Sequence, residues 1–284
     1  NEPRAMTRGE LLEMRRNPVL YESVRHRKQA LARHLREREI LDNLRERVRD
    51  QSTVELQQIG PQQRHYRIYA DDLQGLRFIN RDNKPIRLVQ FENNSAVRRM
   101  RCETATLERS VGSTLGSGNY DLVLNRVEVE DLQREGLENT RTKLSIPGFS
   151  LTRFAKKNLE NWSNERLLEY AGSDAPGLTQ RLRDEIQEIR DEIVGRLNKR
   201  YALAVTALLL TAVGATLAVL LRNSQPLTIY LIAFLPAILD LIVISGGEQT
   251  IRHGDVVEGL AILWSGNGVL LLVLVGVFFK LARN

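Results

Sequence analysis

The residues of this chain that could do chemistry are few, and they lack catalytic spacing. The stretch Gly112–Gly118 is rich in glycine, but it lacks the Lys-Ser/Thr pair of a P-loop, so a flexible hairpin loop is the better interpretation. The four histidines show no metal-ligand spacing with one another or with carboxylates. One cysteine, Cys102, excludes an intrachain disulfide and a cysteine-based zinc site. The sequence therefore predicts a chain that is not an enzyme and has no cofactor and no metal site.

Asp240 stands out because it is the one ionisable residue inside a long apolar run, about five residues from the end of that run. A carboxylate at mid-bilayer is unfavourable by ~2.5–3.5 kcal/mol on insertion scales, so such a group usually faces a cavity or a partner. The alternative is a place near the membrane interface, from which the carboxylate reaches the lipid headgroups. The sequence leaves both interpretations open.

The chain divides into segments that differ in charge, and these segments must position the residues described above. The 284 residues have a formal net charge of +6, but residues 201–284 hold only four of the 41 basic and four of the 35 acidic side chains. Uncharged or nearly uncharged runs at 201–221, 226–245 and 259–279 are each long enough to cross a hydrocarbon core of about 30 Å. We expect these runs to form three transmembrane helices, with a polar loop at 246–258 between the second and the third. A single soluble domain is excluded.

Residues 1–60 are predicted to be a charged helical segment. Thr7 and Glu10 have the spacing of a capping box, and Pro18 interrupts the helix that they begin. Residues 19–50 then predict one long helix with a narrow apolar stripe. Acidic residues interleave with its arginines, so a solvated helix packed on a partner is favoured over a basic helix that binds anionic lipid. Binding to nucleic acid is disfavoured because aromatic residues are nearly absent here.

In residues 61–150, apolar side chains recur at every second position in short runs separated by turns. This pattern is typical of an antiparallel β jelly-roll-like domain. A change of parity at Asn125-Arg126 indicates a bulge or a tight turn. Residues 151–200 predict a helical connector that runs straight into the first span, because no breaker separates Arg196 from Leu210. The expected fold is an α+β membrane protein. The candidate inward-facing side chains of the β-domain are Ile68, Leu76, Phe78, Leu88, Leu122 and Leu124.

This order of a β-domain and three spans resembles the C-terminal half of the LptF/LptG (YjgP/YjgQ) family of lipopolysaccharide-export permeases. The resemblance covers about residues 62–284, and it is a pattern of spacing and not an invariant motif. It is carried by Glu192-x-x-x-Arg196 with Lys199-Arg200-Tyr-Ala-Leu-Ala, by Leu209–Leu217, by Trp264-Ser-Gly-Asn267 with Gly276, by Arg87–Phe91 and by Ile146–Phe149. The chain departs from the family in lacking its first three spans and coupling helix, in Ala215-Thr216 where a proline is usual, and in the helix at 19–50.

The resemblance implies a non-catalytic permease subunit in the cell inner membrane. It would pair with a second permease subunit, and a cytoplasmic ATPase dimer would drive the pair to extract lipopolysaccharide. The β-domain would lie in the periplasm and pass the lipid to a periplasmic bridge of β-domains. Its inward-facing candidates would then line a lipid path, although plain core packing explains them as well. Arg196, Lys199 and Arg200 would lie near lipid phosphates, although interfacial anchoring explains them equally. Three further spans upstream of Asn1 are expected if the resemblance holds.

The distribution of charge favours a different topology and a second function. The β-domain side of the spans carries Arg190, Arg196, Lys199, Arg200 and Arg252, whereas the opposite side carries Arg222, Lys280 and Arg283. The positive-inside rule would weakly place the β-domain in the cytoplasm. The alternative is therefore a membrane-anchored adaptor or scaffold whose basic helix and β-domain bind a protein or an anionic surface.

Overall fold

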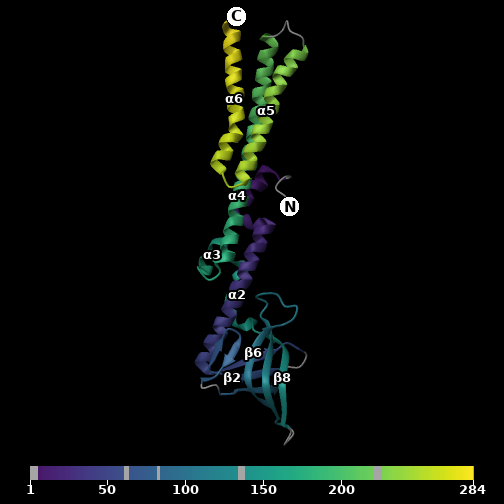
Figure 1. Cartoon of the computed structure of the whole chain (residues 1–284), viewed down its shortest axis with the longest axis vertical. Helices are drawn as coiled ribbons and strands as arrows, with labels where there is room; N and C mark the ends of the chain where they lie inside the picture. Colours follow the sequence, from purple (N-terminus) through teal and green to yellow (C-terminus); the bar gives the residue numbers. More distant parts are fainter. Residues whose placement is uncertain (1–5, 61–63, 82–83, 134–137, 221–225, 284) are drawn as a thin grey trace. The chain divides into compact units, whose positions relative to one another are not determined.

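The computed structural model describes residues 6–60, 64–81, 84–133, 138–220 and 226–283. The chain divides into two compact units, Lys28–Thr179 and the combination of Asn1–Arg27 with Gln180–Asn284. Figure 1 shows their elements. The helices are α1 (Arg8–Arg16), α2 (Glu22–Gln51), α3 (Asn164–Ala171), α4 (Pro176–Leu220), α5 (Pro226–Arg252) and α6 (Val256–Arg283), with short 3-10 turns at Pro18–Leu20, Thr152–Phe154 and Leu159–Asn161. The strands are β1 (Thr53–Gln58), β2 (Arg64–Tyr69), β3 (Asp72–Gln74), β4 (Arg77–Ile79), β5 (Ile86–Glu92), β6 (Ser95–Arg109), β7 (Asn119–Asp131) and β8 (Glu138–Ser150).

The first helix begins at the predicted capping box. The Thr7 hydroxyl accepts a hydrogen bond from the Glu10 amide at 3.3 Å, and the Thr7 amide donates to Glu10 Oε2 at 2.6 Å. These two bonds satisfy amides that have no partner in the first helical turn. The hydrogen bonds from Thr7 lower the pKa of the Glu10 carboxyl. Helix α1 ends at Arg16, just before Pro18, as the sequence predicts.

The strands of the Lys28–Thr179 unit form one antiparallel sheet that closes on itself. The order is β3-β4-β6-β5-β2-β1-β8-β7, and β7 also pairs with β6. Strands β6, β5, β2, β1, β8 and β7 therefore make a closed ring, which we call the barrel, while β3 and β4 extend the sheet from β6. The predicted α+β class with an antiparallel sheet is confirmed. The jelly-roll expected for this domain is not confirmed by the pairing.

The barrel is closed most weakly between β1 and β8. These strands pair only at Gln57 with Ser150 and at Gln58 with Phe149, and we call this junction the β1–β8 seam. By contrast, β7 pairs with both β6 and β8 over nearly its whole length. Residues 138–148 of β8 therefore have β7 as their only paired strand in the described part of the sheet.

Helix α2 contributes directly to the core of the barrel. Ile40, Leu44 and Val48 are fully buried and pack with the inward-facing residues of the strands. The helix is also held by charge, because Glu37 Oε1 accepts hydrogen bonds from Tyr120 Oη at 2.9 Å and from Arg109 Nη2 at 2.6 Å. Burial, together with this bond to Glu37, raises the pKa of Tyr120. The partner of the C-terminal part of the apolar stripe is thus the β-domain of the same chain.

Two strand details differ from the expectation. The runs expected within residues 61–150 were short, but Ser95–Arg109 form the single 15-residue strand β6. Near Arg126 the alternation of buried and exposed residues shifts by one position. This shift involves no bulge between β6 and β7, because the two strands keep one register on both sides of it. Arg126 instead adopts a left-handed backbone, with φ of 51°, and its guanidinium pairs with Glu103 across the sheet at 2.7 Å. Both strands change their buried face together at this point.

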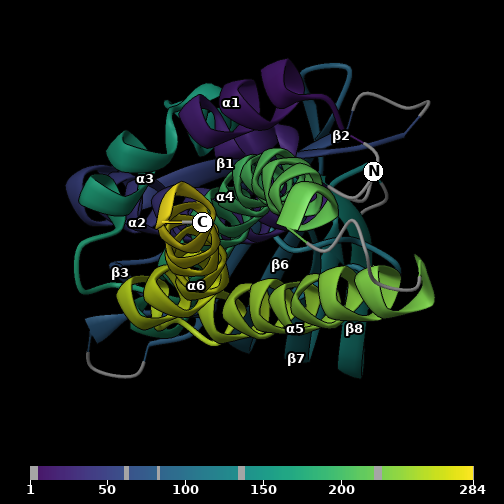
Figure 2. The same ribbon diagram turned by 90° about the horizontal axis from the view of Figure 1, so that it is seen from above.

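Helices α4, α5 and α6 are long and apolar enough to cross a membrane, so the three predicted spans are confirmed at this level. Helix α4 runs unbroken over 45 residues, and Figures 1 and 2 show α5 inclined to it within the same unit. The expected polar loop at 246–258 is wrong, because α5 continues to Arg252 and α6 begins at Val256. Ion pairs of Glu248 with Lys199 and Arg252 hold this additional helical turn.

Candidate functional site

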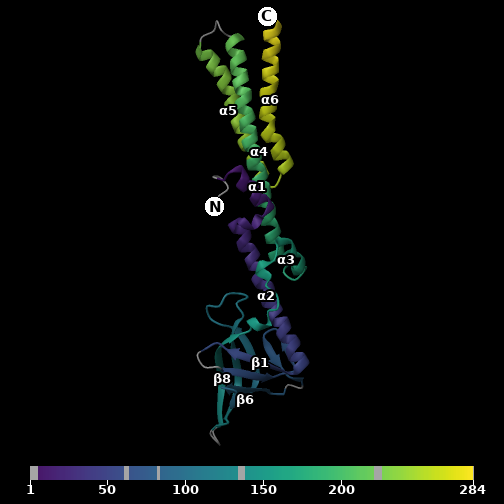
Figure 3. The same cartoon turned by 180° about the vertical axis from the view of Figure 1, so that it is seen from behind.

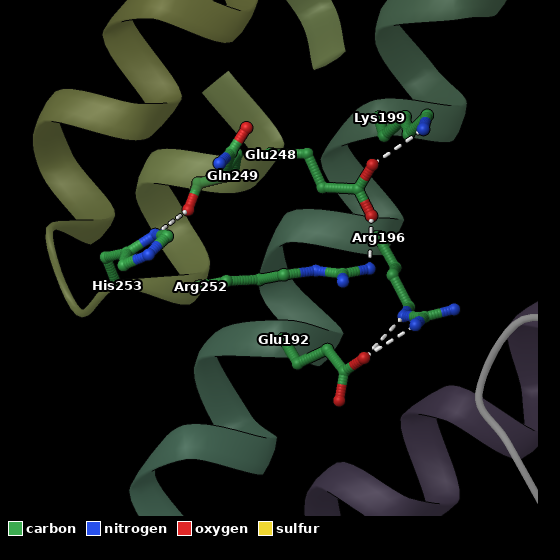
Figure 4. Close-up of polar contacts among 7 residues, drawn as sticks. All are labelled: Glu192, Arg196, Lys199, Glu248, Gln249, Arg252 and His253. Carbon is green, nitrogen blue, oxygen red and sulfur yellow. Dashed lines mark hydrogen bonds and ion pairs between the residues drawn. The ribbon is translucent and has the colours of Figure 1, made fainter. Parts of the chain in front are cut away.

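A cluster of charged side chains lies where α4 and α5 meet at the polar end of the helices (Figure 4). Lys199 Nζ contacts Glu248 Oε2 at 2.6 Å, and Arg252 Nη2 contacts Glu248 Oε1 at 3.0 Å. On α4, Arg196 Nη2 contacts Glu192 Oε1 at 2.5 Å. The Glu248 side chain is only 15% exposed, so its pairing with two cations offsets the cost of its desolvation.

The three basic residues expected at the membrane interface are all brought to one pocket. Arg196, Lys199 and Arg200 line a pocket of about 390 Å³ together with Leu203, Glu248 and Arg252. Arg200 Nη2 also donates to the Met6 carbonyl at 2.5 Å, two residues before α1, and Figure 3 shows α1 beside α4. Four cations and the Glu248 carboxylate line this pocket, and Glu192 pairs with Arg196 beside it, so cations still outnumber carboxylates and the chemistry favours an anion such as a phosphate.

A second polar cluster lies inside the bundle, surrounded by apolar side chains. Asp240 of α5 is 2% exposed, and Thr206 Oγ1 of α4 lies 2.5 Å from its Oδ2. Asn267 of α6 completes the cluster, with Oδ1 3.1 Å from Thr206 Oγ1 and with Nδ2 donating to the Ala202 carbonyl at 3.3 Å. The Asp240 carboxyl group therefore points into the bundle, where it contacts Thr206 of α4 and lies against Gly266 of α6.

Small residues allow α5 and α6 to approach closely beside this cluster. A Cβ added at Gly266 would lie 2.0 Å from Asp240 Oδ1. A Cβ at Gly247 would lie 2.5 Å from the Leu263 nitrogen, and one at Gly259 would lie 2.7 Å from the Ile251 nitrogen. Backbone atoms cannot move aside as a flexible side chain can, so the crossing of the two helices depends on these glycines.

The candidates for a lipid path in the β-domain lie in a sealed core. Ile68, Phe78, Leu88, Leu122 and Leu124 have no exposed surface, and Leu76 is partly buried against them. Core packing therefore accounts for these side chains as the structure stands. The Gly-rich stretch also packs tightly, since a Cβ at Gly116 would lie 2.6 Å from the Arg33 carbonyl oxygen.

An accessible pocket of about 300 Å³ lies at another place in the barrel. Its apolar residues include Met100, Val129, Leu144 and Ile146, and Arg98 and Arg141 are exposed beside them. The lining residues of the described chain come from β2, β5, β6, β7 and β8 but not from β1. Sequence reasoning missed this pocket because alternation separates inner from outer residues, whereas the pocket depends on how residues of five strands come together in space.

Among the described residues, no group of three or more histidine, cysteine, aspartate or glutamate side chains could hold a metal ion. Cys102 is buried in the barrel core, and burial raises the pKa of its thiol to about 12. The sequence matches no family model and no curated protein.

Proposed function

We propose that the chain is a non-catalytic permease subunit of an ABC-type lipopolysaccharide export system. In this proposal it works with a second permease subunit, a cytoplasmic ATPase dimer and a periplasmic β-domain bridge protein. The β-domain lies on the periplasmic side of the cell inner membrane and receives lipid extracted by the helices. The observation that carries the proposal is a pocket of mixed character in a barrel that precedes three membrane helices in the chain.

The pocket suits an anionic amphiphile. Buried Met100 and Ile146 offer an apolar surface for an acyl segment, and exposed Arg98 and Arg141 offer cations for a phosphate or a carboxylate. A volume of about 300 Å³ is at the lower end of ligand pockets, so it admits part of one acyl chain and not a whole lipid. A site of this size fits a step in transfer better than long-term storage of a lipid.

The β1–β8 seam offers a way into the pocket. Within the described residues, β8 pairs with β1 at only two positions, and the Ile59 amide adds one hydrogen bond to the Gly148 carbonyl, so few backbone bonds would have to break on this side of the barrel. Among the described residues, positions 139–146 of β8 pair with β7 alone, and this edge could accept a strand from a partner β-domain. One structural element thus supports both the entry of lipid and its transfer to a bridge protein.

The charged pocket of the bundle supports the same proposal independently. Arg196, Lys199, Arg200 and Arg252 converge at the polar end of the membrane helices, where the phosphates of an anionic lipid would lie. Two of these cations are shared with Glu248, so a lipid phosphate would compete with that carboxylate for them.

A matched pair of photo-crosslinking positions tests the proposal. Leu144 of β8 lines the pocket, whereas Leu124, its cross-strand partner on β7, is fully buried in the core. In cells that make lipopolysaccharide, a crosslinker at Leu144 should capture this lipid only while the partner ATPase hydrolyses ATP, and one at Leu124 should capture none. The transport proposal fails if Leu144 crosslinks only to this chain.

The adaptor remains the second candidate because of the basic residues on the β-domain side. Arg196, Lys199, Arg200 and Arg252 lie at that end of the spans, which favours a cytoplasmic β-domain. A reporter active only in the cytoplasm, fused after Gly118, should stay silent if the β-domain is periplasmic. A strong signal, together with capture of a cytoplasmic protein at Leu144, would support the adaptor instead.

A further inference from the structure

The carboxyl group of Asp240 lacks the partners that a buried carboxylate requires. The residue is 2% exposed, and among the described residues its Oδ2 has the Thr206 hydroxyl as its only hydrogen-bond partner and its Oδ1 has none. The backbone of Gly266 lies against Oδ1 so closely that a Cβ would reach within 2.0 Å, which leaves no room for water on that side. An ionised carboxylate would be left in apolar surroundings with one neutral donor, which is strongly unfavourable.

The number of hydrogens in the cluster points to an added proton. Thr206 Oγ1 lies within hydrogen-bond distance of three oxygens, namely Asp240 Oδ2 at 2.5 Å, the Ala202 carbonyl at 2.9 Å and Asn267 Oδ1 at 3.1 Å. A hydroxyl group has only one hydrogen to donate. If Asp240 is ionised, it takes this hydrogen, and Asn267 Oδ1 then faces an oxygen with no hydrogen between them. If Asp240 is protonated, it donates to Thr206, which can then donate to Asn267 or Ala202.

No cation on the described parts of the three helices is placed to neutralise a carboxylate here. The polar side chains in contact with Asp240 and its neighbours are Thr206 of α4 and Asn267 of α6, and neither is titratable. The nearest charged residues along the helices are Arg200 on α4, Glu248 on α5 and Glu258 on α6. At ~1.5 Å per residue they are offset along the axes by about 9, 12 and 14 Å.

We propose that Asp240, Thr206 and Asn267 form a proton-binding site inside the membrane bundle. Asp240 is a neutral carboxylic acid while α4, α5 and α6 are packed, and it releases its proton only when the helices separate and water reaches it. Packing of the bundle is then linked to pH, with the packed form holding one more proton than the opened form. This inference goes beyond the proposed transport function and does not depend on it.

Infrared spectroscopy of the full chain in lipid vesicles tests the proposal at neutral pH. The carbonyl band of a protonated carboxylic acid is separate from the bands of carboxylates and amides. The wild-type spectrum should contain this band, and Asp240→Asn should remove it while keeping the side-chain shape. Asp255→Asn, which changes an exposed aspartate near the start of α6, should leave the band in place. A wild-type chain with no such band overturns the proposal.

Two further measurements keep the test independent of the Asn variant. Thr206→Val should keep the band but shift its frequency, because the acid loses the hydroxyl oxygen that accepts its hydrogen bond. In the wild-type chain, labelling the aspartates with ¹³C at the side-chain carboxyl carbon should shift the carbonyl band of the protonated acid. Because all other groups keep their isotopes, such a shift assigns the band to an aspartate. If the label moves only carboxylate bands at neutral pH, Asp240 is ionised and the site does not bind a proton.

Discussion

The packing of α5 against α6 gives the sharpest quantitative prediction, because two adjacent glycines differ in their surroundings. A Cβ at Gly247 would lie 2.5 Å from the Leu263 nitrogen and 2.7 Å from the Gly259 carbonyl oxygen. A Cβ at Gly246 would meet nothing within 4 Å. Both residues are inside α5, so substitution by alanine changes helix propensity equally at the two positions.

The expected difference follows from two opposing effects. Replacing glycine by alanine inside a helix is favourable by about 0.5–1 kcal/mol, so Gly246→Ala should stabilise the bundle slightly. Overpacking a close contact costs roughly 1–3 kcal/mol, and the contacts of Gly247 are with backbone that cannot rotate away. The two variants should therefore differ by about 1–3 kcal/mol in the free energy of unfolding, which is about 5- to 150-fold in the equilibrium constant because ~1.4 kcal/mol is tenfold.

The fluorescence of Trp264 on α6 can report on the bundle alone. The chain has two tryptophans, and Trp162 lies in the other unit, so a Trp162→Phe background leaves a single reporter. Both alanine variants would be unfolded in mixed micelles with increasing amounts of a denaturing detergent. Equal midpoints for Gly246→Ala and Gly247→Ala would show that the helices do not cross as closely as the structure has them.

Other predictions concern the barrel and the membrane helices. Leu122→Ala should destabilise the barrel by about 2–5 kcal/mol in chemical unfolding, since the side chain has no exposed surface, and a change below ~1 kcal/mol would contradict its place in the core. Cys102 should react with a maleimide only after unfolding, because it is buried and burial raises the pKa of its thiol to about 12; fast labelling of the folded chain would contradict this. Hydrogen bonds from Arg49, at 2.7 and 2.8 Å, lower the pKa of Asp72. The stabilisation from this pairing is fully present above pH ~4, the pKa of an aspartate in the unfolded chain, and it is lost as the pH falls below that value. In Asp72→Asn, the free energy of unfolding should therefore decrease less steeply with falling pH below pH ~4. Residues 201–284 should keep the full chain in the membrane during alkaline carbonate extraction, and release into the soluble fraction would refute the three spans.

The sequence predicts most reliably the features that depend on local pattern. The capping box at Thr7 and the three apolar spans require only neighbouring residues, and the structure has them. The end of α5 was predicted too early because the polar residues after Ser245 were taken as a loop. Glu248 is stable in a helix there because Lys199, 49 positions earlier in the chain, lies beside it.

The sequence could not predict how strands that are far apart in the chain close the barrel. Alternation correctly placed Phe78 and Leu122 inside the β-domain, but it could not tell a sealed core from an accessible pocket. That difference depends on how five strands far apart in the chain come together around the pocket, which no local pattern encodes. Asp240 was recognised from its isolation in an apolar run, whereas its bond to Thr206, and the bond of Thr206 to Asn267, join three helices and needed the structure.

The β1–β8 seam also has a consequence for how the chain is made. Gln57 must pair with Ser150, and a ribosome adding ~5–20 residues per second takes about 5–20 s to synthesise the residues between them. During that time β1 and β2 can form a hairpin, and β5, β6, β7 and β8 can add to it in succession as each emerges. Closure at Gln57 and Gln58 comes last because it waits for the latest strand. Until then the nascent chain exposes the edge of β1, which makes this edge the segment most in need of a chaperone.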